Sequence, residues 1–301
     1  MRILNLGSLN IDKVYGVEHF VAAGETISCT TFETGCGGKG LNQSVALARA
    51  GAGVAHAGAV GPDGDLLIDT LEEAGVDIHP LRKLVTVSGH AVIQRTPAGQ
   101  NCIIVCPGAN GEVTTAYIDE VLAGFEAGDI LLLQNEISNV DYAIRAAKSR
   151  GMKVAFNASP ITPQLLQYPL ELVDYYLINE VEGKALAGAE VNGNEEILAA
   201  LVRRFAGAAI VLTVGKDGVY YQCGTERAHH GIYDVPVVDT TAAGDTFCGF
   251  FLASIAKGLC AADALRYASL ASSIAVSRKG AAGSIPIWDE VEAFAKTATE
   301  L

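Results

Sequence analysis

Apolar runs of strand length alternate with helical patterns along most of this chain. The predicted strands are residues 1–6, 54–60, 130–134, 154–157, 175–178 and 209–214. The predicted helices between them include residues 42–50, 66–73, 141–150 and 195–205. Continuous runs of Ile, Leu and Val are typical of strands that are buried on both faces, and intervening helices connect such strands in parallel. The chain is therefore predicted to form an α/β fold, with a mostly parallel sheet covered by helices on both faces.

Two stretches depart from this rhythm, at residues 14–34 and 88–106. Both contain alternating β segments, and neither encloses a helix. Such insertions are predicted to form a small separate sheet, which would serve as a lid over the site, as a dimerisation surface, or as both. No internal repeat and no low-complexity linker interrupts the chain, so we expect one domain over residues 1–301.

Composition and charge exclude several classes of protein. Of the 301 residues, 50% are hydrophobic and 18% are charged, which predicts a sizeable core. The net charge of −13 repels nucleic acid and anionic membranes, so neither is an expected partner. No apolar run approaches the roughly 18 residues that span a bilayer, and the N-terminus is typical of a strand rather than of a signal peptide. The seven cysteines form no CxxC pair and are predicted to be free thiols of a cytoplasmic protein.

The segment at residues 239–247 carries the strongest chemical signal. It reads Asp-Thr-Thr-Ala-Ala-Gly-Asp-Thr-Phe and leads into helical patterns at residues 246–257 and 262–276. Its small residues allow backbone N–H groups at the start of a helix to converge on an anion, which the helix dipole also attracts. Asp245 falls in the first turn, where its carboxylate can accept a proton from an attacking hydroxyl group. The alternative is an ordinary helix cap with an acidic residue in the first turn.

A second segment, residues 35–42, places four glycines around Lys39. Glycines permit close approach of the backbone to a polar ligand, and the lysine supplies a cation near phosphate. Lys39 is followed by Gly40 instead of Ser or Thr, so the segment is not a P-loop. It matches the pattern G-x-G-x-x-G formally, although the first predicted strand ends far upstream of it. The alternatives are a flexible turn before a helix and a nicotinamide-dependent oxidoreductase; the second leaves residues 239–247 unexplained.

A third signal lies at residues 7–12, at the carboxyl end of the first predicted strand. Asn10 and Asp12 alternate onto one face there, so both can bind hydroxyl groups of one ligand. The alternative is that these polar residues merely close a strand.

Together these segments resemble the ribokinase-like (phosphofructokinase-B) family of carbohydrate kinases. Residues 37–42 are similar to the first signature of the family, and residues 239–247 are similar to the second. The likeness covers essentially the whole chain, including residues 60–65 and 278–284. The start Gly-Ser-x-Asn-x-Asp resembles family members that act on ribose more than those that act on fructose or adenosine. The resemblance implies a three-layer sandwich with a small β lid, and a homodimer formed through that lid.

The resemblance also implies the reaction, which is ATP-dependent, in-line phosphoryl transfer to O5 of D-ribose with Asp245 as general base. It implies sugar contacts from Asn10, Asp12, Gly38, Lys39, Asn42, Glu136 and Asp245. It implies a nucleotide groove and an anion hole lined by Asn179, Thr213, Gly215, Gly218, Ala242, Ala243, Gly244 and Ser269. Mg²⁺ would be bound with ATP and, through water, by Glu182. A K⁺ site, built mostly from backbone carbonyl groups, would comprise Asp239, Thr241, Ala275, Arg278, Gly280 and Ser284.

Three other activities are compatible with the same residues. A kinase of this family could act on deoxyribose, on a nucleoside or on a hexose, and the sequence does not distinguish these sugars. A non-catalytic sugar-binding regulator on the same fold is a more remote alternative. The presence of Asp245, Lys39 and Glu182 together argues against it, because a protein without catalysis has no physical reason to retain a base, an anion hole and a metal-binding element.

Overall fold

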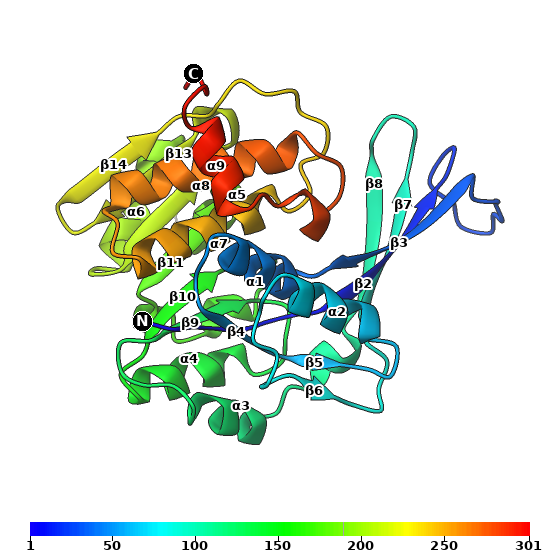
Figure 1. Ribbon diagram of the computed structural model, residues 1–301, viewed down its shortest axis with the longest axis horizontal. Helices are drawn as coiled ribbons and strands as arrows, with labels where there is room; N and C mark the ends of the chain where they lie inside the picture. Colours follow the sequence, from blue (N-terminus) through cyan, green and yellow to red (C-terminus); the bar gives the residue numbers. More distant parts are fainter. Residues whose placement is uncertain (189) are drawn as a thin grey trace.

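The computed structural model of this protein describes residues 1–188 and 190–301. Its main sheet has, within these ranges, the strand order β14-β13-β12-β11-β10-β9-β1-β4 (Figure 1). The parallel strands are β1 (Ile3–Leu6), β4 (Val54–Ala57), β9 (Ile130–Gln134), β10 (Lys153–Asn157), β11 (Tyr175–Asn179) and β12 (Ala209–Thr213). An antiparallel hairpin of β13 (Val219–Cys223) and β14 (Glu226–His230) completes one edge. The predicted α/β class with a mostly parallel sheet is confirmed.

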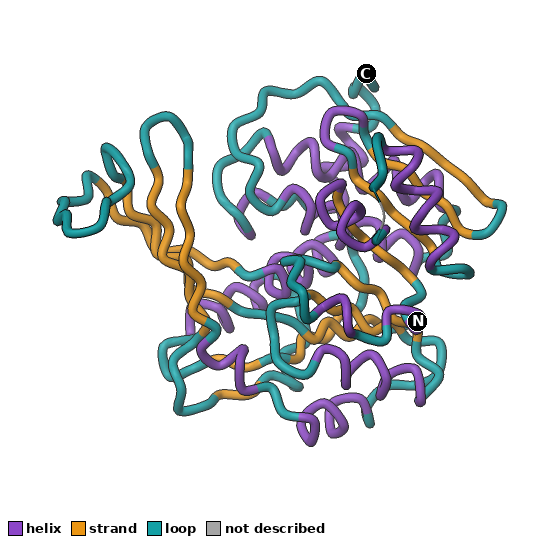
Figure 2. The backbone as a smooth tube through the Cα atoms, turned by 180° about the vertical axis from the view of Figure 1, so that it is seen from behind, coloured by secondary structure: helices purple, strands orange, loops and turns teal. Residues whose placement is uncertain are grey.

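Helices cover both faces of the main sheet, and alternate residues of the buried strands contact opposite layers. In β9, Ile130 and Leu132 belong to one hydrophobic cluster, and Leu131 and Leu133 belong to the other. The first cluster is completed by α1 (Lys39–Arg49), α2 (Asp65–Glu73), α7 (Ala243–Ala256), α8 (Ala261–Val276) and α9 (Trp288–Phe294). The second is completed by α3 (Thr115–Leu122), α4 (Val140–Ser149), α5 (Glu180–Ala187) and α6 (Asn194–Arg204). This arrangement is the predicted three-layer sandwich (Figure 2).

Several predicted boundaries were wrong, and the clearest case is decided by contacts between segments that are distant in the sequence. The strand expected at residues 54–60 is divided into β4 and β5 (Ala59–Val60), and β5 pairs with β6 (Arg82–Lys83). Gly58 separates them because its N–H donates to the Tyr117 hydroxyl (2.8 Å) and its carbonyl accepts from Arg82 N (3.0 Å). The helix expected from residue 42 begins at Lys39 instead.

A small sheet projects from the body of the molecule (Figure 1). Its strand order is β3-β2-β7-β8, with β2 (Asn10–Gly16), β3 (Thr31–Gly37), β7 (Gly89–Arg95) and β8 (Asn101–Cys106). Strands β7 and β8 account for most of the insertion predicted at residues 88–106, whereas only residues 14–16 and 31–34 of the insertion predicted at residues 14–34 are strand. Asn10 and Asp12 were predicted at the carboxyl end of the first strand, but both lie in β2, where they pair with β3 and β7.

The remaining elements are short 3-10 helices that lie in the connections. They are η1 (Gly108–Glu112), η2 (Leu165–Gln167), η3 (Leu170–Leu172), η4 (Gly215–Asp217) and η5 (Ala282–Ser284). All seven cysteines fall in the described ranges, and each is a free thiol, as predicted. No helix within residues 1–188 and 190–301 has both the length and the apolar character needed to cross a bilayer.

Candidate active site

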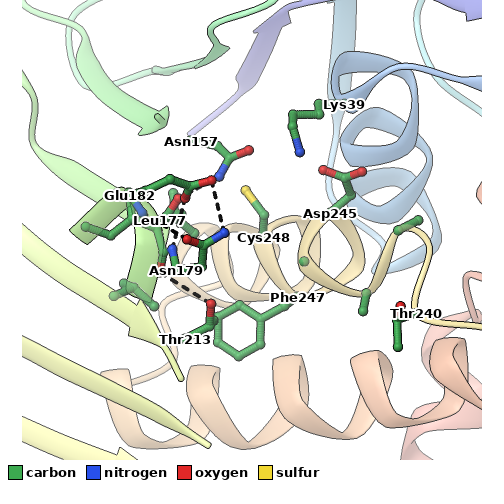
Figure 3. A pocket seen from close by; sticks show the side chains of 15 residues that line it. Lys39, Asn157, Leu177, Asn179, Glu182, Thr213, Thr240, Asp245, Phe247 and Cys248 are labelled. Atoms are coloured by element: carbon green, nitrogen blue, oxygen red, sulfur yellow. Dashed lines mark hydrogen bonds between the residues drawn. The ribbon is translucent and has the colours of Figure 1, made fainter. Parts of the chain in front are cut away.

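A pocket of about 250 Å³ opens where the carboxyl ends of β10, β11 and β12 meet the first turn of α7. We call it the central pocket, and Figure 3 shows the side chains that line it. Its lining includes these residues singled out from the sequence: Lys39, Asn179, Glu182, Thr213, Ala242, Ala243, Gly244 and Asp245. Carboxyl ends of parallel strands and N-termini of helices are the usual ligand-binding positions of α/β folds.

The first turn of α7 forms one wall of the pocket. Ala242, the N-cap, adopts φ 59° and ψ 9°, a left-handed conformation that is uncommon for residues with a Cβ atom. Helix α7 begins at the next residue, and Thr246 N donates to Ala242 O (2.8 Å). The preceding N–H groups of a first turn have no intrahelical acceptor, and the helix dipole adds partial positive charge there. The turn can therefore bind an anion in the pocket.

Asp245 is buried, and two amide side chains of α1 donate to its carboxylate. Asn42 Nδ2 lies 3.0 Å from Asp245 Oδ2, and Gln43 Nε2 lies 2.8 Å from Asp245 Oδ1. The two helices approach closely because Gly249 of α7 has no side chain: a Cβ atom there would lie 2.3 Å from the Cβ atom of Ala46. The carboxylate is thus held firmly at the edge of the pocket.

Lys39 is the first residue of α1, and Figure 3 shows its side chain at the same end of the pocket as Asp245. Burial lowers the pKa of Lys39, but the charges of Asp245, Glu136 and Glu182 outweigh that effect and raise the pKa above its ordinary value. The ammonium group therefore remains protonated. Gly38 before it adopts φ 89°, which favours glycine.

Asn10, Asp12 and Glu136 gather beside the start of α1. Glu136 accepts hydrogen bonds from Lys39 N (3.0 Å) and from the Ser8 hydroxyl group (2.5 Å). Asn10 Oδ1 accepts from Asn110 Nδ2 (2.8 Å), which leaves the amide N–H groups of Asn10 to donate elsewhere. Burial, together with the charge of Glu136, raises the pKa of Asp12 to about 6. The structure therefore brings the predicted sugar-contacting residues together.

Replacing Asp12 with asparagine is expected to stabilise the ligand-free protein at alkaline pH. The pKa of Asp12 rises from 3.8 to about 6 in the folded state, so the folded state binds the proton more strongly. The resulting stability is fully present below the unfolded pKa and is lost as the pH rises through the folded pKa. After discounting for solvent screening, we expect burial of the charge to cost about 1–2 kcal/mol at about pH 8. Thermal unfolding of both proteins at about pH 4.5 and about pH 8 tests this, and an equal difference at the two pH values would contradict it.

Glu182 and Asn179 lie across the central pocket from Lys39. They form a capping box at the start of α5, in which Asn179 N donates to Glu182 Oε2 (2.9 Å) and Asn179 Nδ2 donates to Glu182 Oε1 (3.1 Å). Both oxygens are thus engaged, and an indirect contact to Mg²⁺ through water fits this carboxylate better than direct ligation. Within the described ranges, no cluster of three or more His, Cys, Asp or Glu side chains could hold a metal.

The two loops predicted to bind a monovalent cation lie together. Asp239 Oδ1 accepts from the backbone N–H (2.9 Å) and the hydroxyl (2.6 Å) of Thr241, and Asp239 Oδ2 accepts from Gly280 N (3.1 Å). Burial raises the pKa of Asp239, but the hydrogen bonds from Thr241 and Gly280 lower the pKa by more than burial raises it. The pKa of Asp239 is therefore below its usual value. Arg278 forms an ion pair with Glu290 (2.7 Å). Ala275 lies in the last turn of α8, and Ser284 is buried in η5.

Three predicted nucleotide-contacting residues are absent from the lining of the central pocket, namely Gly215, Gly218 and Ser269. Gly215 and Gly218 lie in the turn between β12 and β13. Gly218 has φ 83°, and a Cβ atom there would lie 2.1 Å from His230 O, so packing alone requires this glycine. Ser269 is buried in α8.

Several residues that complete the site were not predicted from the sequence. Gln43 contacts Asp245, Asn110 holds Asn10, and Asn157 and Cys248 line the central pocket. Gln43 had a readable signal, since it follows Asn42 in the same turn of a predicted helix. Asn110 had none, because its contact to β2 joins residues 100 positions apart.

On this fold, a helix terminus that can bind an anion lies beside a buried carboxylate and a lysine, which is an arrangement suited to a small-molecule kinase. The chain belongs to the pfkB family of carbohydrate kinases, whose family model matches residues 2–288. The first residues of the glycine-rich segment belong to β3 of the small sheet and not to a loop after a strand of the main sheet, which removes the remaining support for an oxidoreductase.

Known relatives cover nearly the full chain. Ribokinase of Haemophilus influenzae is 35% identical over 298 residues, with 96% of each chain covered. Deoxyribokinase of Salmonella typhi is 30% identical over 303 residues, with 98% of each covered. The structure of Arabidopsis thaliana ribokinase complexed with ribose and ATP matches with a TM-score of 0.86 at 30% identity, and 98% of both chains are covered. These findings confirm the predicted family, the fold class and the sugar kinase activity.

Proposed function

We propose that this protein phosphorylates D-ribose at O5 with ATP as the phosphoryl donor. The observation that carries the proposal is the placement of the Asp245 carboxylate between the first turn of α7 and the Lys39 ammonium group. A base, a cation and a row of N–H donors at one point suit in-line transfer between a hydroxyl group and a phosphate.

In this mechanism Asp245 accepts the proton of the attacking O5 hydroxyl group. The N–H groups of Ala243 and Gly244, together with Lys39, stabilise negative charge on the transferring phosphoryl group. Glu182 would hold Mg²⁺ through water, and the ion, bound with ATP, would supply further charge neutralisation. Thr213 and Asn179 contribute to the nucleotide groove, which we extend over Gly215, Gly218 and Ser269. The transfer is direct, so no covalent intermediate forms on the protein.

The sugar would bind between β2 and the start of α1. Asn10 offers amide donors, while Asp12 and Glu136 offer carboxylate acceptors, and several ring hydroxyl groups can pair with such a set. Among the described residues, Asn42 Oδ1 is a buried oxygen without a hydrogen-bond partner, and it would accept a bond from the sugar. The backbone of Gly38 lies beside these groups and lets the sugar approach closely.

We assign two roles to the small sheet within a single domain over residues 1–301. It would close over the sugar and exclude water, which limits idle hydrolysis of ATP. It would also form the interface of a homodimer, because Ile103, Ile104 and Val105 of β8 are at least half exposed. A cytoplasmic location is consistent with an ATP-dependent enzyme that keeps its cysteines as thiols.

Steady-state turnover of a sugar panel with ATP and Mg²⁺ tests the proposal. We expect the highest kcat/KM for ribose, because a site that pairs with each hydroxyl group discriminates against analogues that lack one. Equal kcat/KM for 2-deoxyribose would show that no residue here binds the 2-hydroxyl group. Higher values for a hexose or a nucleoside would reject ribose and leave the kinase assignment in place.

Potassium is expected to activate the enzyme at least about threefold over tetramethylammonium. Oxygen donors of the loops around Asp239 and Gly280 suit K⁺, and an ion there would order the turn that leads into α7. Initial rates at equal ionic strength in potassium, sodium and tetramethylammonium salts provide the measurement. Identical rates in all three salts would reject the predicted cation site and would leave the kinase assignment in place.

A further inference from the structure

Gln43 is fully buried, and its amide contacts the Asp245 carboxylate directly. We propose that Gln43 is a positioning residue for the catalytic carboxylate of Asp245. A hydrogen-bonded chain of buried amides, made of Gln43, Gln134 and Asn5, fixes the orientation of the Gln43 side chain. The inference rests on the proposed role of Asp245 as the base. It assigns to Gln43 the orientation of Asp245 Oδ1, which leaves Oδ2 to accept the proton.

Both N–H donors and the oxygen of the Gln43 amide are engaged by other protein groups. Its Nε2 donates to Asp245 Oδ1 (2.8 Å) and to Asn157 Oδ1 (3.1 Å), and its Oε1 accepts from Gln134 Nε2 (2.7 Å). A side chain that is buried and saturated in this way cannot turn toward a ligand without losing hydrogen bonds. Gln43 therefore acts through Asp245 and does not contact the substrate.

Asn42 behaves differently, although it is the adjacent residue. It donates to Asp245 Oδ2 (3.0 Å), but its own Oδ1 has no partner within the described ranges. If a sugar that bonds to this Oδ1 turns the Asn42 side chain, the bond to Asp245 Oδ2 is released and that oxygen is free to take the proton. The bond from Gln43 to Oδ1 then remains to hold the carboxylate in place.

The hydrogen bonds of Gln43, Gln134 and Asn5 can all be satisfied in only one orientation of their amide groups. A carboxylate only accepts hydrogen bonds, so Gln43 must present Nε2 to Asp245 and Oε1 to Gln134. Gln134 Nε2 also donates to Asn5 Oδ1 (3.0 Å), and Asn5 Nδ2 donates to Gly40 O (2.8 Å). The Gly40 carbonyl also only accepts. Acceptors at both ends therefore prevent the Gln43 amide from reversing and placing its oxygen against Asp245.

Kinetics of Gln43→Met test this role, because methionine fills the space but cannot donate. We expect kcat to fall about 10- to 100-fold, while the KM values for the sugar and for ATP change less than about threefold. Gln134→Met should lower kcat less, by about 3- to 10-fold, since it only loosens the orientation of Gln43. Val45→Ala is the control for lost stability, because it removes buried methyl groups from the same helix without changing the hydrogen-bonded amides of Gln43, Gln134 and Asn5. Equal kcat values for Gln43→Met and Val45→Ala would overturn the proposal.

Two further measurements keep the result decisive. If Gln43→Met does not fold, Gln43→Asn keeps an amide at the position but falls one methylene short of Asp245, and we expect the same loss of kcat. A crystal structure of whichever of these two variants folds should show the Asp245 carboxylate rotated away from its wild-type position. An unmoved carboxylate would contradict the proposed positioning role of Gln43. Because the wild type is assayed alongside on the sugar panel, failure of the proposed function appears there first and is distinct from failure of this inference.

Discussion

Asp245→Asn is expected to lower kcat at least about 10²- to 10⁴-fold, because it removes the proposed general base. The substituted amide also presents a donor to Asn42 Nδ2 or Gln43 Nε2, which both donate to the carboxylate in the wild type. ATP binding should be nearly unchanged, since the first turn of α7 supplies its donors through the backbone. Steady-state kinetics and calorimetric titration with ATP measure the two effects separately.

Asp174→Asn provides the matched control for this substitution. Asp174 is an ion-paired carboxylate that contacts Lys148 (2.7 Å) and does not line the central pocket. We expect its loss to lower the melting temperature while kcat stays within about twofold of the wild type. Near-normal turnover by Asp245→Asn would show that the base has been assigned to the wrong residue.

Asp12→Ala is expected to raise the KM for ribose by about 10²-fold while changing the KM for ATP less than about threefold. Asp12 lies on β2 beside Glu136, away from the lining of the central pocket. Loss of its carboxylate leaves sugar hydroxyl groups unpaired in a desolvated site, and such losses are large. Kinetics with one substrate varied at a time separate the two KM values.

Asp65→Ala serves as the control for Asp12→Ala. Asp65 is exposed and pairs with Lys83 (2.7 Å), so its removal should leave both KM values unchanged. A sugar KM that does not respond to Asp12→Ala would remove Asp12 from the sugar site and would weaken the choice of ribose.

Several features of this protein could be predicted from local sequence alone. The apolar run at residues 130–134 became β9 with the predicted bounds, because the buried strand has no polar alternation to mislead the assignment. The segment at residues 239–247 was predicted to open a helix that can bind an anion, and α7 begins within it. Both results depend on interactions between residues that are close in the chain, namely side-chain periodicity and the open N–H groups of a first helical turn.

Other predictions were incomplete because distant contacts decide them. Strand β4 ends before Gly58 because the Gly58 N–H group donates a hydrogen bond to the hydroxyl group of Tyr117, which lies 59 residues later in the sequence. Asn10 and Asp12 belong to the small sheet because β3 and β7 pair with β2, and no local pattern specifies those partners. Gly218 stays in the predicted nucleotide groove, and the structure adds a packing reason for glycine there that the sequence could not show, because a Cβ atom would lie 2.1 Å from His230 O.

Periodicity and residue type are properties of short segments, so the α/β class, the family resemblance and the identity of the chemical groups could be predicted before folding is considered. How those groups meet depends on the folded chain. Asn42 and Gln43 reach Asp245 across 203 and 202 positions of the chain, and the contact exists because Gly249 lets α7 pack closely against α1. Such a contact depends on the shape of two packed helices, and helix packing is set by the whole core rather than by any one segment.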